Sequence, residues 1–390
     1  MRRRFRPIDR RPDRVKAPLP HWPAVVLTCL VALPCPAAAQ PVVKPALLVT
    51  TDALTNVAGG LAHGGDVLTK IDASLSFDGY RSGARGWTGH VSVQHVSGRF
   101  SDRFVGDAQV VSNIEATGAL RLFEGWVGYA ASDRLTFKAG LIDLNSEFDQ
   151  QEAGKLFLNA SHGIGADFSQ TGENGPSIFP TAAGAVFVRY ATGNWTVRLG
   201  AFDGVAGSPT HPRRTVASFP GRRGGLLIGE VARAIGRGHG QIGVWTYTSR
   251  FDHLDKASRS RRGNHGGYAL LQQRILDFSD ERGIDLWVRA GAANPKINTI
   301  AVYAGGGMVA DLKLVRLGIG VAHARTGRTA RMLTPLERAE TSTELTAAFR
   351  LNDHVHVQPE LQWIVNPSWR QDLGDAVVLG LRVILSSFDT

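Results

Sequence analysis

Cysteine is almost absent from this chain of 390 residues, which contains only two, Cys29 and Cys35. Both lie within the first 39 residues, so the remainder has no disulfide framework and no thiolate for catalysis or metal binding. Long hydrophobic runs are also missing. The longest, from Ala24 to Leu33, is about half the ~20 residues that a transmembrane helix needs. A helical membrane protein and a disulfide-rich scaffold are therefore excluded.

Motifs for common catalytic chemistry are missing too. The sequence has no HExxH zinc motif, no GxSxG nucleophile elbow and no complete nucleotide-binding glycine loop. Of the twelve histidines, His354 and His356 stand two residues apart, without further residues at metal-ligand spacing. The sequence thus predicts no enzyme, no cofactor and no metal.

The N-terminus reads as a secretory signal. Eight basic residues precede the apolar run, and small residues end at Ala39, the expected cleavage position. Removing eight basic and two acidic residues lowers the formal charge from +10 to +4. The strong basicity thus belongs mostly to residues 1–39, and no nucleic-acid partner is expected.

What the rest of the chain contains is a repeated alternation with period two. From Val67 to Asp78, mainly apolar residues alternate with charged or hydroxylic ones, and similar patterns occur at residues 194–202, 354–364 and 375–386. This alternation is typical of β-strands that have one apolar face and one polar face.

About fifteen such segments can be counted, each of ~8–12 residues, which is long enough to cross a membrane at a tilt. They are residues 67–78, 87–96, 120–131, 134–142, 184–191, 194–202, 225–235, 239–248, 266–276, 283–292, 299–310, 313–324, 340–350, 354–364 and 375–386.

Short turns alternate with longer loops between these segments, which favours an all-β transmembrane antiparallel barrel. Single-chain bacterial barrels usually have an even number of strands. About sixteen strands are therefore expected, with the missing one at residues 46–52 or 100–116. A soluble propeller would show an internal repeat of ~40 residues, and none is found. The predicted organisation is a signal peptide at 1–39, a short periplasmic segment at 40–66 and a barrel at 67–390.

The loops carry a family resemblance. SDRFVGDAQ at residues 101–109, RLFEGW at 121–126, GLIDLNSEF at 140–148, NGPSIFP at 174–180 and QPELQWIVNP at 358–367 occur in order along the chain. Together they resemble the carbohydrate-selective porin family of the OprB type.

That resemblance implies a barrel in the outer membrane of a Gram-negative bacterium, reached after export and signal cleavage near Ala39. Its inward-folded constriction loops would narrow a water-filled pore that passes monosaccharides such as glucose by diffusion. The implied partners are sugars or other small solutes, outer-membrane lipid and the barrel assembly machinery.

A pore selective for sugars needs paired hydrogen-bond donors and acceptors and an aromatic surface at a narrow point. The side chains predicted to line the lumen carry both signs of charge and are Lys70, Asp72, His90, Gln94, Arg121, Glu124, Lys138, Arg189, Arg198, Glu230, Arg289, Glu344, Arg350, Glu360 and Arg382. Those predicted to bind the solute at the constriction are Asp102, Arg103, Arg121, Glu124, Asn145, Glu147, Phe148, Phe157, Asn159, Asn174 and Phe179.

Structural roles compete with solute binding at each of these positions, because loop asparagines form turns and loop aromatics anchor loops to walls. Other functions also compete. Basic residues at 210–223 and 256–262 favour an anion-preferring or general small-nutrient channel as the alternative. A barrel enzyme or an adhesion barrel lacks the residues or the extra domain it would need.

Overall fold

The computed structural model describes residues 42–216, 224–279 and 282–387. The predicted signal peptide lies outside the described residues and stays a prediction. Neither described helix, α1 nor α2, is long and apolar enough to cross a membrane.

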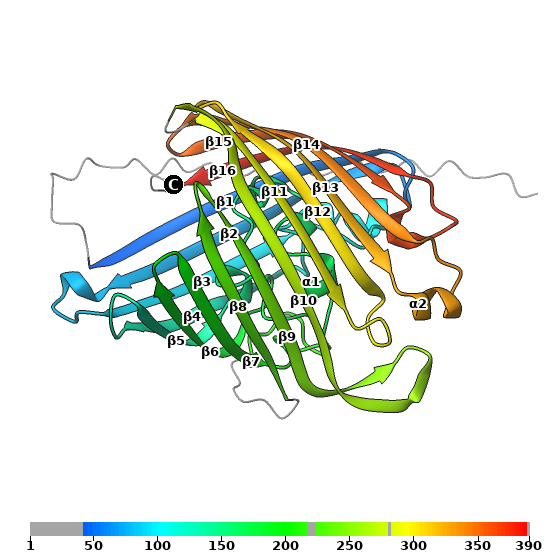
Figure 1. Ribbon diagram of the computed structural model, residues 1–390. Coiled ribbons are helices and arrows are strands. Elements are labelled where there is room, and N and C mark those ends of the chain that lie inside the picture. The colour runs from blue at the N-terminus through cyan, green and yellow to red at the C-terminus, as the bar shows by residue number, and fades with distance from the viewer. Residues whose placement is uncertain (1–41, 217–223, 280–281, 388–390) are drawn as a thin grey trace, which may run out of the picture. The chain divides into compact units, whose positions relative to one another are not determined.

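Within the described residues, sixteen antiparallel strands form one closed barrel, in which each strand pairs with its neighbours in sequence and β1 pairs with β16. Figure 1 shows them running obliquely around the barrel. The strands are β1 (Val43–Ala58), β2 (Gly64–Asp78), β3 (Trp87–Ser97), β4 (Ala119–Ala130), β5 (Leu135–Ile142), β6 (Ala183–Thr192), β7 (Trp195–Asp203), β8 (Gly225–Ile235), β9 (Gly238–His253), β10 (Lys256–Ser279), β11 (Arg282–Ala293), β12 (Ile300–Asp311), β13 (Val315–Thr326), β14 (Ala339–Asn352), β15 (Val355–Val365) and β16 (Ala376–Ser386).

The helical segments are short and lie in the connections. They are η1 (Gly79–Arg81), η2 (Ser101–Val105), η3 (Leu144–Ser146), η4 (Gly154–Leu156), η5 (Ala160–His162), α1 (Ala166–Ser169), α2 (Arg328–Leu333) and η6 (Pro367–Trp369).

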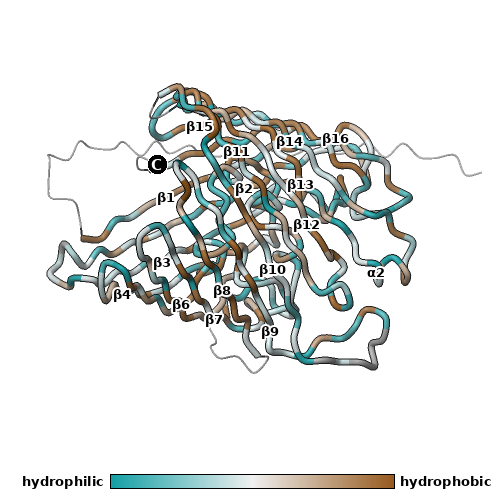
Figure 2. The backbone as a smooth tube through the Cα atoms, in the orientation of Figure 1, coloured by the Kyte–Doolittle hydropathy of each residue, from teal (hydrophilic) through white to brown (hydrophobic). Residues whose placement is uncertain are grey.

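Alternation of side chains explains why these segments form barrel strands. On β7, Trp195, Val197 and Leu199 are exposed on the outer face, whereas Gly200 and Phe202 on the opposite face are buried. Figure 2 shows hydrophobic and hydrophilic residues following one another along the strands. An apolar outer face suits lipid, and an inner face with polar groups suits a water-filled lumen.

Fifteen of the strands, β2–β16, overlap the segments predicted from alternation, and the all-β barrel prediction is confirmed. The remaining strand is β1, which covers residues 46–52. The prediction of a periplasmic segment at residues 40–66 is therefore wrong, because β1 closes the barrel from Val43 onward. Its faces are mixed, with Thr50 and Asp52 inside and Thr51 and Thr55 outside, so the sequence lacks a clean apolar alternation there.

Residues 100–116 do not contain a strand. They begin with the π-helical turn η2 and continue as loop. The short turns, such as residues 193–194, 236–237 and 353–354, and the long loops occupy opposite ends of the strands. We call these ends the short-turn rim and the long-loop rim.

Two of the long loops contribute to the interior of the barrel. Residues 98–118 and 143–182 supply buried side chains that pack against the inner faces of the strands. In one cluster Phe148 and Phe168 of the second loop pack with Phe187, Phe202 and Trp245 of the wall. We call residues 143–182 the constriction loop.

Candidate functional site

The constriction loop is fixed to the wall by a buried arginine. Arg289 of β11 donates from Nε and Nη2 to the Asp149 carboxylate, at 3.1 and 2.8 Å, and forms a second ion pair with Asp167. All three side chains are fully buried. Because Asp149 and Asp167 lie 18 residues apart, Arg289 holds two points of the loop on one strand.

Glu230 of β8 holds the same part of the loop from another side. Its Oε2 accepts from the backbone N–H of Asp149 at 2.9 Å and from the Tyr268 hydroxyl at 2.6 Å. Its Oε1 accepts from Arg198 Nη1 at 2.6 Å. The Asp149 backbone is thus positioned by a carboxylate whose own charge is balanced by Arg198.

A third anchor joins the middle of the loop to β14 and β15. Glu344 accepts from the backbone N–H groups of Leu158 and Asn159 at 2.7 and 2.9 Å. The Gln358 amide donates to the Leu156 carbonyl at 2.7 Å. These contacts satisfy backbone groups that burial would otherwise leave without partners.

The other inward loop is held in the same way. Glu340 accepts from the backbone N–H groups of Ala108 and Gln109 at 2.8 and 2.9 Å. Asp52 of β1 pairs with Arg382 of β16 at 2.6 Å and accepts from Ser112 at 2.6 Å. Polar side chains of β1, β8, β11 and β14–β16 are therefore occupied in holding loops, and carry little of the lining that a solute would meet.

Accessible polar and aromatic side chains gather instead between β2–β5 and the loop. Lys70 and Asp72 of β2 form an ion pair at 3.1 Å, and each side chain keeps 21% of its surface accessible. Lys70 Nζ also lies 5.1 Å from the centre of the Phe179 ring, which belongs to the constriction loop. Phe179 in turn meets Phe123 of β4 edge to face at 6.5 Å.

A second cation–aromatic pair lies on β4 and β5. Lys138 Nζ is 4.1 Å from the centre of the Trp126 ring and forms an ion pair with Glu147 of the loop. Trp126 also stacks on His90 of β3, with ring centres 5.6 Å apart. We call Lys70, Asp72, Trp126, Lys138, Glu147 and Phe179 the wall–loop cluster.

The entrance to the loop beside this cluster holds two neighbouring carboxyl groups. Glu124 accepts from the backbone N–H of Asp143 at 3.1 Å. Burial, and next the charge of Glu124, raise the pKa of the Asp143 carboxyl to about 7. Near neutral pH, Asp143 therefore exchanges a proton at the edge of the wall–loop cluster.

The wall–loop cluster combines donors, acceptors and aromatic faces from the barrel wall and from the constriction loop. Ammonium and carboxylate groups make the strongest hydrogen bonds available to a hydroxyl-rich solute. The charges are already paired, Lys70 with Asp72 and Lys138 with Glu147, so a neutral molecule meets strong dipoles without a large net charge. Within the described residues, no group of three or more His, Cys, Asp or Glu side chains is arranged to hold a metal.

Three of the predicted constriction residues lie in or beside the wall–loop cluster, namely Glu147, Phe179 and, through its contact with Asp143, Glu124. Arg121 is buried on β4, where its guanidinium donates to the Pro212 carbonyl at 2.8 and 3.0 Å. Asp102 and Arg103 lie in η2 at the long-loop rim, where Asp102 pairs with Arg99, and Arg103 pairs with Asp66 at 2.7 Å. They do not contact the wall–loop cluster.

The remaining predicted residues fold the loop. The Asn145 amide donates to three loop carbonyls, those of Phe148, Asp149 and Gly163. The other loop-forming residues are Asn159, which donates to Ser342 and Gln362, Asn174, which donates to the Ala206 carbonyl, and Phe148 and Phe157, which are buried in hydrophobic clusters.

Sequence reasoning missed Trp126, Asp149 and Asp167. Trp126 had a usable signal, because it follows Glu124 at an interval of two on a predicted strand. Asp149 and Asp167 had none, since their partner Arg289 is more than a hundred residues away.

Solved structures resemble this barrel over most of its length. A high-pH structure of Pseudomonas putida OprB has 19% sequence identity and a TM-score of 0.78, covering 88% of this chain and 94% of that one. A mutant Rh. blastica porin has 8% identity and a TM-score of 0.53, covering 88% and 99%. A loop-deletion mutant of Vibrio cholerae OmpT, an outer membrane protein, has 10% identity and a TM-score of 0.53, covering 88% and 98%. These similarities establish the porin fold.

A comparison with curated protein sequences finds no match. The family comparison does: the model of the carbohydrate-selective porin, OprB family, matches residues 62–386, which is most of the chain. The chain belongs to the OprB family of carbohydrate-selective porins.

Proposed function

We propose that this outer-membrane porin passes monosaccharides such as glucose by passive diffusion, and that the wall–loop cluster is where they bind. The observation that carries the proposal is the pairing of each lysine with both a carboxylate and an aromatic ring. Lys70 contacts Asp72 and the Phe179 ring, and Lys138 contacts Glu147 and the Trp126 ring.

A pyranose ring has hydroxyl groups around its edge and C–H groups on its faces. The edge suits the ammonium and carboxylate groups of the cluster, and a face suits the rings of Trp126 and Phe179. Conduction requires binding strong enough to favour entry and weak enough to allow exit. Groups that already have partners give such moderate binding, because the solute shares them rather than supplying their only partner.

The alternative is a channel that prefers anions or takes small nutrients in general. Arg189 and Arg198 stand opposite each other on β6 and β7, and Arg213 and Arg214 are exposed in the loop that follows β7. The rest of the basic stretch at 210–223, from residue 217, lies outside the described residues, as do most side chains of 256–262. An anion channel would draw on these arginines, whereas a sugar channel would draw on the wall–loop cluster.

We further infer that export removes residues 1–39 after Ala39 and that the barrel assembly machinery then inserts the protein into outer-membrane lipid. The basic start, the apolar run and the small residues before Gln40 support the first step. The apolar outer face of the strands supports the second. The protein acts in this account as a channel, not as an enzyme.

The test is the single-channel current of the refolded protein in a planar bilayer, first in a salt gradient and then with millimolar glucose. We expect weak ion selectivity and a saturable block by glucose. Glu147→Gln removes a charged acceptor, worth about 1.5–3 kcal/mol, so the half-blocking concentration should rise about tenfold or more. Arg103→Gln at the long-loop rim is the control and should leave the block unchanged.

A strong anion preference without any glucose effect would contradict the sugar channel and support the alternative. Equal block in the wild type and in Glu147→Gln would place sugar binding outside the wall–loop cluster.

A further inference from the structure

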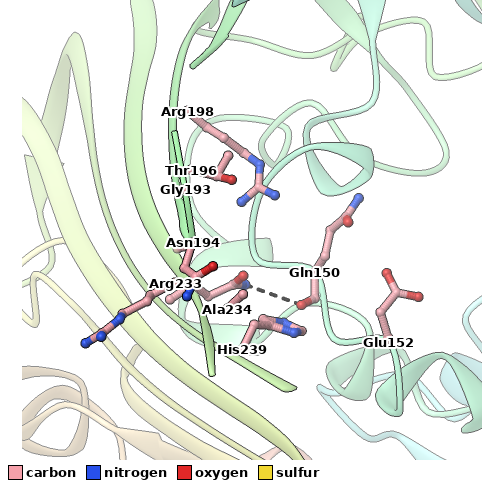
Figure 3. A pocket seen from close by; sticks show the side chains of 11 residues that line it. Gln150, Glu152, Gly193, Asn194, Thr196, Arg198, Arg233, Ala234 and His239 are labelled. Atoms are coloured by element: carbon pink, nitrogen blue, oxygen red, sulfur yellow. Dashed lines mark hydrogen bonds between the residues drawn. The ribbon is translucent and has the colours of Figure 1, made fainter. Parts of the chain in front are cut away.

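A polar cavity lies beside the short turn that joins β6 to β7, apart from the wall–loop cluster. Its volume is about 240 Å³, and its lining includes Gln150 and Glu152 of the constriction loop and Thr196, Arg198 and His239 of the wall. Figure 3 shows the side chains of Arg198, His239 and Glu152 around one space, with Arg233 pointing away from it.

Strand register places this cavity next to Lys138 of the wall–loop cluster. Lys138 of β5 is opposite Phe187 of β6, which is opposite Gly200 of β7. Arg198 is two residues closer to the short-turn rim than Gly200. At ~4.8 Å between strands and ~3.3 Å per residue, the Cα atoms of Lys138 and Arg198 are roughly 12 Å apart. The cavity therefore lies on the short-turn side of Lys138, where a solute moving from Lys138 toward this rim would meet it.

The charges that line the cavity are balanced by partners beside it. Arg198 Nη1 donates to Glu230 Oε1 at 2.6 Å. This bond uses one of the five N–H donors of the Arg198 guanidinium. Glu152 accepts from Lys155 at 2.7 Å. The cavity therefore presents a guanidinium and a carboxylate as hydrogen-bonding groups, with little net charge to attract an ion.

The shape of the cavity depends on contact between loop and wall. The Gln241 amide of β9 donates to the Gln150 carbonyl at 3.3 Å, which is the dashed line in Figure 3. This bond holds the loop residues opposite Thr196 and His239. A volume of about 240 Å³ holds several waters and is of the size of one pyranose ring.

We propose that this cavity is a second binding site for one neutral monosaccharide, at the short-turn end of the channel. The inference rests on the proposed function and adds a separate step to it. A sugar would move from the wall–loop cluster to the Arg198–Glu152 site before it leaves, and two weak sites in series keep release fast.

The test uses the absence of cysteine beyond residue 39, which makes an introduced thiol unique in the mature chain. Thr196→Cys places a thiol in the cavity. Arg233→Cys, at the border of the cavity on β8 but with its side chain directed away from it, is the matched control. The labelling rate by a small methanethiosulfonate is measured in lipid nanodiscs with increasing glucose, and with dextran of equal viscosity as the reference.

We expect glucose to slow labelling of Thr196→Cys severalfold and saturably, and to leave Arg233→Cys unchanged. Adding Glu152→Gln and His239→Leu to Thr196→Cys should weaken the protection, whereas adding Phe179→Ala should not. A change in mobility on SDS gels between unheated and heated samples checks that each barrel is folded.

Labelling of Thr196→Cys that glucose does not slow would overturn the second site. If glucose still blocks the current of the same preparation, the channel proposal stands and only the second site fails. If glucose neither blocks nor protects, both proposals fail.

Discussion

Replacing the buried Arg289 should release the constriction loop from the barrel wall. Arg289→Met removes the guanidinium that pairs with both Asp149 and Asp167, and leaves two carboxylates inside the barrel. Breaking a buried ion pair by removing one partner costs about 3–5 kcal/mol. The backbone hydrogen bonds of the barrel do not depend on this pair, so the cost falls on the constriction loop.

Release of the loop is measured by hydrogen exchange of peptides that cover residues 148–168, in detergent micelles. A cost of about 3–5 kcal/mol in local opening corresponds to exchange faster by roughly 10²- to 10⁴-fold. Removing all three charges, in Arg289→Met with Asp149→Asn and Asp167→Asn, should restore most of the protection, because no unpaired charge stays buried.

Arg274→Met is the matched control. Arg274 pairs with Asp285 at 2.9 Å between β10 and β11, close to the short-turn rim and away from the loop. A partly accessible pair is worth about 1 kcal/mol or less, so exchange of the loop should not change. Unchanged exchange in Arg289→Met, or equal exchange in the single and triple variants, would refute the reasoning.

Three further predictions concern other parts of the interior. Lys138→Gln leaves Glu147 without its cation, so the reversal potential in a salt gradient should shift in the direction of greater cation selectivity. The lost interaction between the two charges is worth about 1 kcal/mol, and an unchanged potential would contradict the pairing. Burial lowers the pKa of His162 to about 3, below ~6.5 in the unfolded chain, so stability should fall as the pH drops through that range, by about 2 kcal/mol at pH 5. Urea unfolding of His162→Phe should lack this loss, and an acid sensitivity equal to that of the wild type would count against it. A Cβ at Gly291 would lie 2.2 Å from Asp167 Oδ2, so Gly291→Ala should displace Asp167 and cost about 1–3 kcal/mol, seen as faster exchange of residues 160–170; unaltered exchange would contradict the close contact.

Strand positions were predictable because lipid and water select side chains with a period of two. The pattern located β7, for example, since Trp195, Val197 and Leu199 must all face lipid. It failed for β1, where small and hydroxylic residues such as Thr51 and Thr55 occupy the outer face. Local alternation gives a weaker signal when threonines interrupt the apolar face and leucines such as Leu54 lie on the polar one.

The candidate site was predictable only in part. Glu147 and Phe179 were found because they lie in a long loop whose sequence resembles a known family. Asp102 and Arg103 lie in the other inward loop, but the structure pairs them with rim residues. Long-range anchors such as Glu340 and Glu344 determine which part of a loop faces the lumen. These contacts join residues far apart in the sequence, so they cannot be predicted from the spacing of residues within the loop.

Uptake of labelled glucose into proteoliposomes tests the central claim most directly, because it measures transport of the neutral sugar itself. We predict uptake that saturates with glucose concentration in the wild type, and that becomes closer to linear in a variant with Glu147→Gln and Phe179→Ala. Linear uptake in both proteins, with equal slopes, would contradict the claim that the wall–loop cluster binds the sugar during passage.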